Sequence, residues 1–244
     1  MKKKTSRIII EKNNYEMSKF HEDKDYHSYV NKLLESNIPP IDFLHQFPAY
    51  TGKVNLSMFL SLYELYKKVS NLKGHISEIG VWKGASLLFL AKLVSIFEPY
   101  SNTIVHGFDN FMGMKPSNDE VKKGLKTGSY KSDYHQLKKI IKLQKLDGIV
   151  KIHKLDVTKD LKKFSNVYKS TVFKLIFFDA GVYEVLNKSL PFFWDRLVKG
   201  GVIIFDQFNY ECAFGETRAV REILNDRKIE TINWSRTPSA FITK

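Results

Sequence analysis

The chain has 244 residues, of which 43% are hydrophobic and 27% are charged, as in an ordinary soluble globular protein. No apolar run approaches the ~20 residues of a membrane-spanning helix, and the single cysteine, Cys212, excludes an intrachain disulfide and a cysteine-rich zinc site. The net charge of +13 favours anionic partners, and we expect a cytoplasmic protein without a membrane span.

The first part of the chain, residues 1–54, is predicted to be an arm followed by a helical lid. Residues 1–20 are polar and basic, which indicates a loose arm. Helices are expected at 26–36, stopped by a proline pair, and at 43–47, ended by Pro48. Asn55 is the expected N-cap of a long amphipathic helix that runs to about Leu72.

Residues 55–244 are expected to form one domain, in which strands and helices alternate from residue 75 onward. The continuously apolar segments at 173–178 and 201–205 are typical of central parallel strands that are buried on both faces. The alternation predicts an α/β fold with a doubly wound, seven-stranded, mostly parallel sheet. Strands are expected at 75–80, 103–108, 149–154, 172–178, 201–206, 229–234 and 239–243, and helices at 84–97, 132–145, 158–167, 183–197 and 215–227.

A glycine-rich turn joins the first of these strands to the next helix, with the spacing Glu78-x-Gly80-x-x-x-Gly84. Such turns bring the backbone close to nucleotides at the carboxyl ends of strands. The turn has neither the three glycines of a dinucleotide site nor the Gly-Lys-Ser/Thr of a phosphate loop. Because Glu78 would repel a pyrophosphate, the turn suits a ligand with a cationic group or free hydroxyls. It resembles the first motif of class I S-adenosylmethionine (SAM) methyltransferases.

Acids stand at the ends of five successive predicted strands: Glu78, Asp109, Asp156, Asp179 and Asp206. Each of them could be a helix cap, but their recurrence at one edge of the sheet indicates a shared site. A carboxylate accepts two hydrogen bonds from a vicinal diol, so Asp109 suits a ribose, and Asp156 is placed to meet an adenine amino group. Asp179 and Asp206 would lie nearer the reacting end, where they could hold a divalent cation or take a proton from a substrate hydroxyl.

Five segments in order resemble the macrocin O-methyltransferase family, whose members methylate hydroxyls of sugars and glycosylated natural products. They are Glu78-Ile-Gly-Val-Trp-Lys-Gly84, Gly107-Phe-Asp-Asn-Phe-Met-Gly113, Phe178-Asp-Ala-Gly-Val-Tyr-Glu184, Lys199-Gly-Gly-Val-Ile-Ile-Phe-Asp206 and Gly215-Glu-Thr-Arg-Ala-Val220. The resemblance covers roughly residues 55–225. It implies SAM as the cofactor, held by Glu78, Gly80, Gly84, Asp109 and Asp156 and by Val81, Trp82, Ser86, Asn110, Phe111, Val157 and Asp179.

Two departures from the family pattern concern the acceptor end of the site. The family usually has Asp-Gly-Asp after the fourth strand and Asp-Asp after the fifth, whereas this chain has Gly181 and Gln207 in place of the second acids. Asp179 and Asp206 alone make a weak Mg²⁺ site, so a metal requirement is doubtful. The candidates for the general base are Asp179, Asp206, Glu184, His135 and His106, although a lone histidine is more often structural.

Several readings of the function follow. The main hypothesis is methylation of a hydroxyl on an anionic, nucleotide-linked sugar, by a protein that could form a homo-oligomer. N-methylation of an amino sugar is an alternative, because a neutral amine needs less help from a base. An RNA methyltransferase would account for the positive charge, but no RNA-binding signature is present and nucleic acid is not the expected partner. A degenerate, non-catalytic SAM-binding protein is a further reading, from a different class.

Overall fold

A computed structural model describes residues 26–244 of the protein, so the predicted arm at 1–20 lies outside the described residues. The chain divides into two compact units, Met1–Leu56 and Ser57–Lys244. In the first unit, α1 (Tyr26–Glu35), α2 (Pro40–His45) and α3 (Phe47–Tyr50) are short helices. The Tyr29 hydroxyl donates to the Tyr50 carbonyl over 2.7 Å. The prediction that Pro48 ends a helix was wrong, because Pro48 occupies the first turn of α3, where no backbone N–H is needed.

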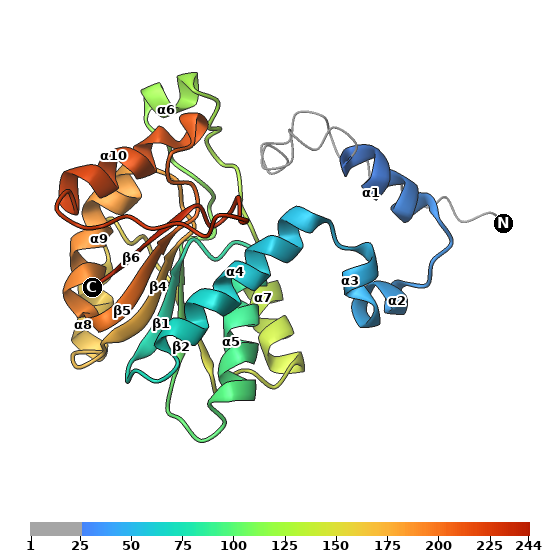
Figure 1. The fold of residues 1–244 in the computed structure, drawn as a ribbon, viewed down its shortest axis with the longest axis horizontal. Helices are drawn as coiled ribbons and strands as arrows, with labels where there is room; N and C mark the ends of the chain where they lie inside the picture. Colours follow the sequence, from blue (N-terminus) through green and yellow to red (C-terminus); the bar gives the residue numbers. More distant parts are fainter. Residues whose placement is uncertain (1–25) are drawn as a thin grey trace. The chain divides into compact units, whose positions relative to one another are not determined.

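The second unit contains a mostly parallel sheet with the strand order β3-β2-β1-β4-β5-β6. Its first five strands are parallel to one another, and β6 pairs with β5 in the antiparallel direction. This order is that of a doubly wound fold, so the predicted fold class is confirmed (Figure 1). The strands are β1 (His75–Ile79), β2 (Val105–Asp109), β3 (Val150–Lys154), β4 (Phe173–Phe178), β5 (Leu197–Phe205) and β6 (Ala240–Thr243).

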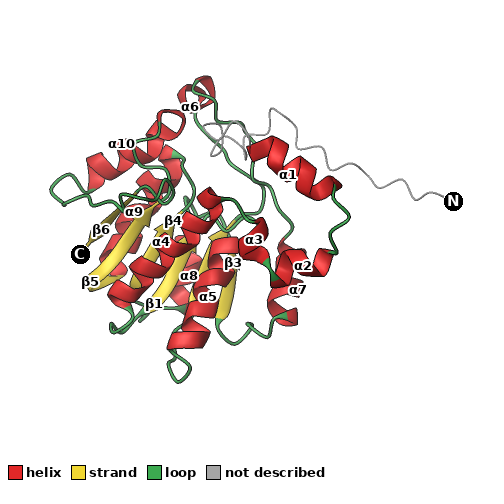
Figure 2. Ribbon diagram, turned by 45° about the vertical axis from the view of Figure 1, so that its right-hand side comes forward, coloured by secondary structure: helices red, strands yellow, loops and turns green. Residues whose placement is uncertain are grey.

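Helices cover both faces of this sheet, as Figure 2 shows. One face packs against α4, α5 and α7 and the other against α8, α9 and α10. Side chains of β4 alternate between these two cores, with Leu175 in the first and Ile176 in the second, which explains why the strand is apolar throughout. The helices are α4 (Lys53–Val69), α5 (Ala85–Phe97), α6 (Asn118–Lys122), α7 (Tyr134–Leu143), α8 (Leu161–Val167), α9 (Tyr183–Arg196) and α10 (Phe214–Ile223), and a short 3₁₀ helix, η2, covers Glu211–Ala213.

Two predicted elements differ from the structure. The sheet of the described residues has six strands rather than seven, because the segment predicted as a strand at 229–234 makes only an isolated bridge between Glu230 and Phe241. The terminal strand instead forms its ladder with β5. Helix α4 begins at Lys53, so Asn55 lies inside its first turn and is not its N-cap. No helix in the described part of the chain has the length and apolar character needed to cross a membrane.

Two histidines, the buried His106 and the half-buried His153, lie on neighbouring strands among aromatic rings of the second core. His106 of β2 and His153 of β3 place Nδ1 and Nε2 2.9 Å apart, so that one ring donates to the other. Aromatic rings surround the pair, including Phe164 and Tyr168 of the α8 region. Burial, together with the charge of His153, lowers the pKa of His106 to about 3, and burial lowers the pKa of His153 to about 4. Both rings are therefore neutral in the folded protein.

This histidine pair should make the protein sensitive to mild acid. At pH 5 the unfolded chain protonates a histidine with the ordinary pKa of 6.5, but the folded state keeps His106 neutral, so stability falls as the pH falls. The expected loss from His106 between pH 7.5 and pH 5 is about 2 kcal/mol. Urea unfolding at both pH values should show a smaller pH dependence in His106→Phe than in wild type. The exposed control His135→Gln should behave as wild type, and an unchanged dependence in His106→Phe would contradict the assignment.

Candidate functional site

The glycine-rich turn after β1 has three residues with positive φ. Gly80 and Gly84 have positive φ values of 91° and 85°, and Trp82 between them has φ 47°. A Cβ built at residue 80 would overlap the carbonyl oxygen of Asp179, so glycine is required where the ends of β1 and β4 meet. At residue 84 a Cβ would lie 2.6 Å from Leu137 Cδ1. The turn therefore brings the backbones that follow β1 and β4 into close contact at the carboxyl edge of the sheet.

Glu78, near the end of β1, is the most unusual group at this edge. Its side chain is fully buried, and one oxygen, Oε1, accepts a hydrogen bond from Ser86 Oγ over 2.8 Å. The other oxygen, Oε2, has no hydrogen-bond partner among the described residues. A buried oxygen left without a donor costs roughly 1–3 kcal/mol, which a ligand that supplies an N–H or a cation would remove. Glu78 and Ser86, both predicted cofactor residues, are therefore joined by a hydrogen bond.

The acids that follow the neighbouring strands form one electrostatic cluster with Glu78. Burial is the main cause that raises the pKa of Glu78 well above its usual range, opposed by the Ser86 hydrogen bond. The negative charges of Asp179, Asp109 and Asp206 raise the pKa of Glu78 further. The structure therefore brings four of the five predicted strand-end acids together. A site with this field favours a positively charged ligand.

Asp109 holds the glycine-rich turn in place from the end of β2. Its Oδ2 accepts from the Trp82 N–H at 2.8 Å and its Oδ1 from the Phe111 N–H at 2.6 Å. Each carboxylate oxygen has a second lone pair, so a ribose diol can still be bound. Asn110 also serves the local turn, because its Oδ1 accepts from the Met112 N–H.

Other predicted cofactor residues have largely structural surroundings. Val81 is 2% exposed and Phe111 is 3% exposed, and both pack in the first core, which leaves mainly their backbones for a ligand. Asp156 uses Oδ1 to accept from the backbone and hydroxyl of Thr158, and it is not among the charges that act on Glu78. Its neighbour Val157 is 8% exposed and packs in the second core.

Three predicted base candidates lie away from the acid cluster. Glu184 and His135 are exposed, in the first turns of α9 and α7. His106 lies in the aromatic core described above rather than at a strand end. Asp179 is half-buried and Asp206 is fully buried, and both directly follow a strand. Across the described residues, no group of three or more His, Cys, Asp and Glu side chains is arranged to hold a metal ion.

Gln207 and Gly181, which are far apart in sequence, are in direct contact. Gly181 has φ 61°, and a Cβ built there would overlap Gln207 Oε1. Gln207 is 6% exposed, and its Oε1 has no hydrogen-bond partner among the described residues. Its backbone N–H donates over 2.6 Å to Oε1 of the buried Glu216 on α10. The two departures from the family pattern therefore form a single structural unit.

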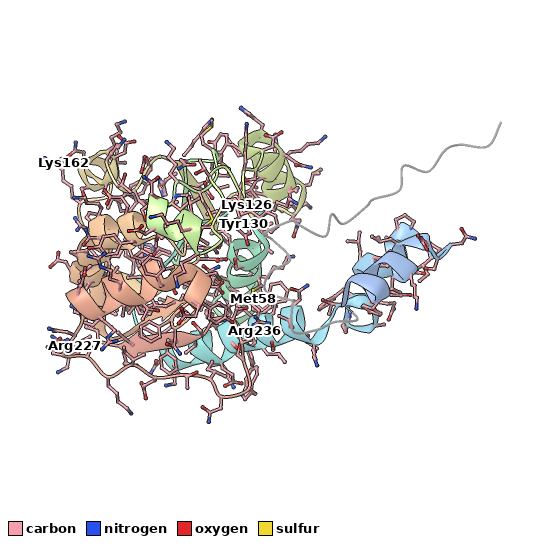
Figure 3. All side chains as sticks on the ribbon, turned by 90° about the horizontal axis from the view of Figure 1, so that it is seen from above. Met58, Lys126, Tyr130, Lys162, Arg227 and Arg236 are labelled. Atoms are coloured by element: carbon pink, nitrogen blue, oxygen red, sulfur yellow. The ribbon has the colours of Figure 1, made fainter. Side chains whose placement is uncertain are left out.

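The segment between β2 and α7 crosses this edge and contains a residue that the sequence interpretation missed. Glu120 of α6 is 1% exposed, and it accepts from the Tyr183 N–H, at the start of α9, over 2.7 Å. The Ser132 hydroxyl ties the other end of the segment to the Trp82 carbonyl over 2.7 Å. Figure 3 looks down on the side where α6 lies in Figure 1 and labels Lys126 and Tyr130 on this segment. The capping box formed by Ser117 and Glu120 was a readable signal for the short helix.

An open cavity of about 340 Å³ lies beside this edge, between the loop after β5 and α10. The first of its lining residues, Asn209, follows Gln207 by two positions in the chain, and both cationic and acidic side chains line the cavity. Arg218 is paired with Glu222, whereas Arg221 is exposed. The lining residues are Asn209, Tyr210, Glu211, Phe214, Thr217, Arg218, Arg221 and Glu222.

Comparison with known proteins identifies similar sequences and folds. Residues 77–208 match the family model described as a methyltransferase domain. The structure is similar to that of CalS11, described as a calicheamicin methyltransferase, with a TM-score of 0.79, 22% identity and coverage of 91% of this chain and 92% of that chain. The apo structure of CalS11, described as a TDP-rhamnose 3'-O-methyltransferase, gives a TM-score of 0.74, 23% identity and coverage of 91% and 94%. The O-methyltransferase NovP gives 0.62, 15% identity and coverage of 78% and 80%. No curated protein sequence matches this chain.

Proposed function

Because the chain belongs to the methyltransferase domain family, we propose that it transfers a methyl group from SAM to a hydroxyl of a nucleotide-linked sugar. The observation that carries the donor half of this proposal is the unpartnered, fully buried Oε2 of Glu78. The acceptor half is supported by the similarity to CalS11, whose description gives TDP-rhamnose as its substrate.

The residues at the strand ends suit SAM. The amino group and the sulfonium of SAM are cationic, so they would offset the negative charge that Glu78, Asp109, Asp179 and Asp206 accumulate. Glu78 Oε2 would accept a hydrogen bond from the amino group, and Asp109 would accept from the ribose hydroxyls through its free lone pairs. When bound, SAM supplies a methyl group that an oxygen nucleophile can displace from sulfur.

The chain's part in the reaction is to orient the acceptor and to remove one proton. As the acceptor oxygen bonds to the methyl carbon, its O–H proton must pass to a base. Asp179 and Asp206 are the candidates that lie at the strand ends, and both belong to the charge cluster around Glu78. They are also the candidate ligands if a divalent cation takes part. Glu184 and His135 are less suited, because both are exposed and lie outside that cluster.

The cavity beside α10 offers space for the rest of the acceptor. Its volume of about 340 Å³ is at the lower end of the range for small-molecule sites. Arg221 on its wall would attract the phosphates of a nucleotide-linked sugar. A cytoplasmic location, where nucleotide-linked sugars would be available, and assembly into a homo-oligomer stay predictions from the sequence.

Turnover with SAM tests the proposal. The protein is incubated with SAM and a panel of nucleoside-diphosphate sugars that includes TDP-rhamnose, and release of S-adenosylhomocysteine is measured. We expect release that depends on the sugar. Turnover only with amino sugars would favour N-methylation, and turnover only with RNA would favour an RNA methyltransferase. SAM binding without turnover on any acceptor would support the degenerate SAM-binding protein and contradict the proposal.

A further inference from the structure

We propose that Gln207 is a specificity-determining residue for the methyl acceptor, whose side-chain carbonyl accepts a hydrogen bond from a hydroxyl next to the one that is methylated. This inference rests on the proposed function and deepens it. The feature that carries it is the contact between Gln207 and Gly181, together with the unpartnered Oε1 of Gln207.

Gln207 is held from two sides, so its side chain occupies a defined place. Its backbone N–H is fixed by the fully buried Glu216 of α10. Its carboxamide lies over Gly181, in space that any larger residue would fill. The same space is bounded by Ala213 of η2, because a Cβ at residue 181 would lie 3.7 Å from Ala213 Cβ. The Gln207 carbonyl also accepts a hydrogen bond over 3.1 Å from the N–H of Tyr210, a residue that lines the cavity, so Gln207 lies at the start of the loop that forms the cavity wall.

The chemistry of the carboxamide suits a neutral polyol. Oε1 is an acceptor without a donor, and the acids at neighbouring strand ends carry no proton that they could donate when ionised. A sugar hydroxyl would supply the missing donor. A second carboxylate at residue 207 would instead add charge next to Asp206, in a cluster that is already strongly negative. The glutamine thus provides acceptor recognition without further charge, and Gly181 provides the room that its length requires.

Two variants test this inference by different routes. Gln207→Met keeps the length and volume of the side chain but removes the hydrogen-bonding group. Gly181→Ala leaves the glutamine intact but forces its carboxamide out of place. Gln144→Met, on an exposed glutamine at the end of α7, is the matched control. SAM affinity is measured by calorimetry, the sugar kinetics with TDP-rhamnose or the best sugar of the panel, and folding by thermal unfolding.

We expect both site variants to lose about 10- to 100-fold in kcat/KM for the sugar, with SAM affinity changed by less than about threefold. The control should match wild type in all measurements. In Gln207→Ala, a further Gly181→Ala should cost less than Gly181→Ala does in wild type, because the clash with the carboxamide is gone and only the strain of alanine at φ 61° is left. If wild type turns over the sugar and Gln207→Met does so equally well, the inference is overturned and the proposed function stands. If wild type turns over no sugar, the proposed function itself fails. Equal loss of SAM affinity and turnover in folded Gln207→Met would place the residue in the donor site and would also overturn the inference.

Discussion

Replacing Glu78 with glutamine is expected to stabilise the free protein and at the same time to weaken SAM binding about 10- to 100-fold. Glutamine keeps the size of the side chain and an oxygen for Ser86 Oγ, but it removes a fully buried charge that three aspartates oppose. Affinity falls because a hydrogen bond to a charged group contributes about 1.5–3 kcal/mol. A buried charged residue that lowers the stability of the free protein is typical of a binding site.

The direction of the stability change in Glu78→Gln follows from the raised pKa of Glu78. The raised pKa means that folded Glu78 holds its proton above the ordinary value of 4.5, so its contribution to stability is lost as the pH rises from that value. Glu78→Gln should therefore be more stable than wild type at pH 7.5, because glutamine has no proton to lose as the pH rises. The difference should shrink toward pH 4.5.

Denaturant unfolding measures the predicted gain in stability, and SAM calorimetry on the same preparations measures the predicted loss of affinity. Glu64→Gln, on the half-exposed surface of α4, is the control and should change neither quantity. A Glu78→Gln protein that is less stable than wild type at pH 7.5 would contradict the electrostatic argument. A Glu78→Gln protein that binds SAM as tightly as wild type would show that Glu78 takes no part in SAM binding.

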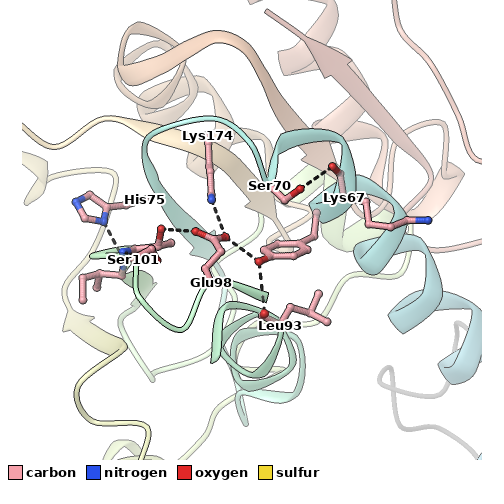
Figure 4. Close-up of polar contacts among 10 residues, drawn as sticks. Lys67, Ser70, His75, Leu93, Glu98, Ser101 and Lys174 are labelled. Atoms are coloured by element: carbon pink, nitrogen blue, oxygen red, sulfur yellow. Dashed lines mark hydrogen bonds and ion pairs between the residues drawn. The ribbon is translucent and has the colours of Figure 1, made fainter. Parts of the chain in front are cut away.

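Replacing Lys174 with methionine should destabilise the fold by about 3–5 kcal/mol, the usual cost of leaving one partner of a buried ion pair alone. Lys174 lies in β4 and is fully buried, and its Nζ lies 2.7 Å from Glu98 Oε1 (Figure 4). Glu98 also accepts from the hydroxyls of Tyr66 and Thr103, each over 2.7 Å. Burial is the largest single influence on the pKa of Glu98 and acts to raise it, but the hydrogen bonds with Lys174, Thr103 and Tyr66 together outweigh burial and lower the pKa.

The double variant Lys174→Met/Glu98→Leu separates the contribution of the ion pair to stability from the contribution of side-chain packing. Removing both charges leaves no unpaired ion, so the double variant should recover part of the stability that Lys174→Met loses. Equilibrium unfolding in urea of the single and double variants measures this coupling. A single variant within about 0.5 kcal/mol of wild type, or losses that simply add, would show that the pair is not a coupled unit. SAM affinity should not change, because this network belongs to the amino-terminal end of β4.

The sheet could be predicted from the sequence because the hydrophobic pattern and the strand-end acids repeat along the chain. The alternation of apolar strands and amphipathic helices specifies a doubly wound fold regardless of side-chain detail. The strand predicted at 229–234 was not recovered, since β-branched residues there indicate extended chain but not its partner. The terminal strand β6 found its partner in β5, which a local pattern does not encode.

The candidate site was less predictable, because its important contacts join residues that are distant in sequence. The acids Glu78, Asp109, Asp179 and Asp206 could be found because each lies at or directly after the carboxyl end of a strand. The burial of Glu120 against the start of α9, and of Gln207 against Gly181, depends on how loops cross the sheet edge. His106 shows the opposite case: a candidate base by residue type, it lies in an aromatic core whose position only the register of β2 and β3 reveals.

Transfer of an isotopically labelled methyl group tests the central claim most directly. The protein is incubated with SAM labelled in its methyl group and with the best nucleotide-linked sugar, and the product is examined by mass spectrometry and NMR. The account predicts a product that is heavier by one labelled methyl group, bound to a sugar oxygen, and a much slower reaction with Glu78→Gln at SAM concentrations that saturate wild type only. Unlabelled sugar after complete incubation, or label on nitrogen or on the nucleobase, would contradict it.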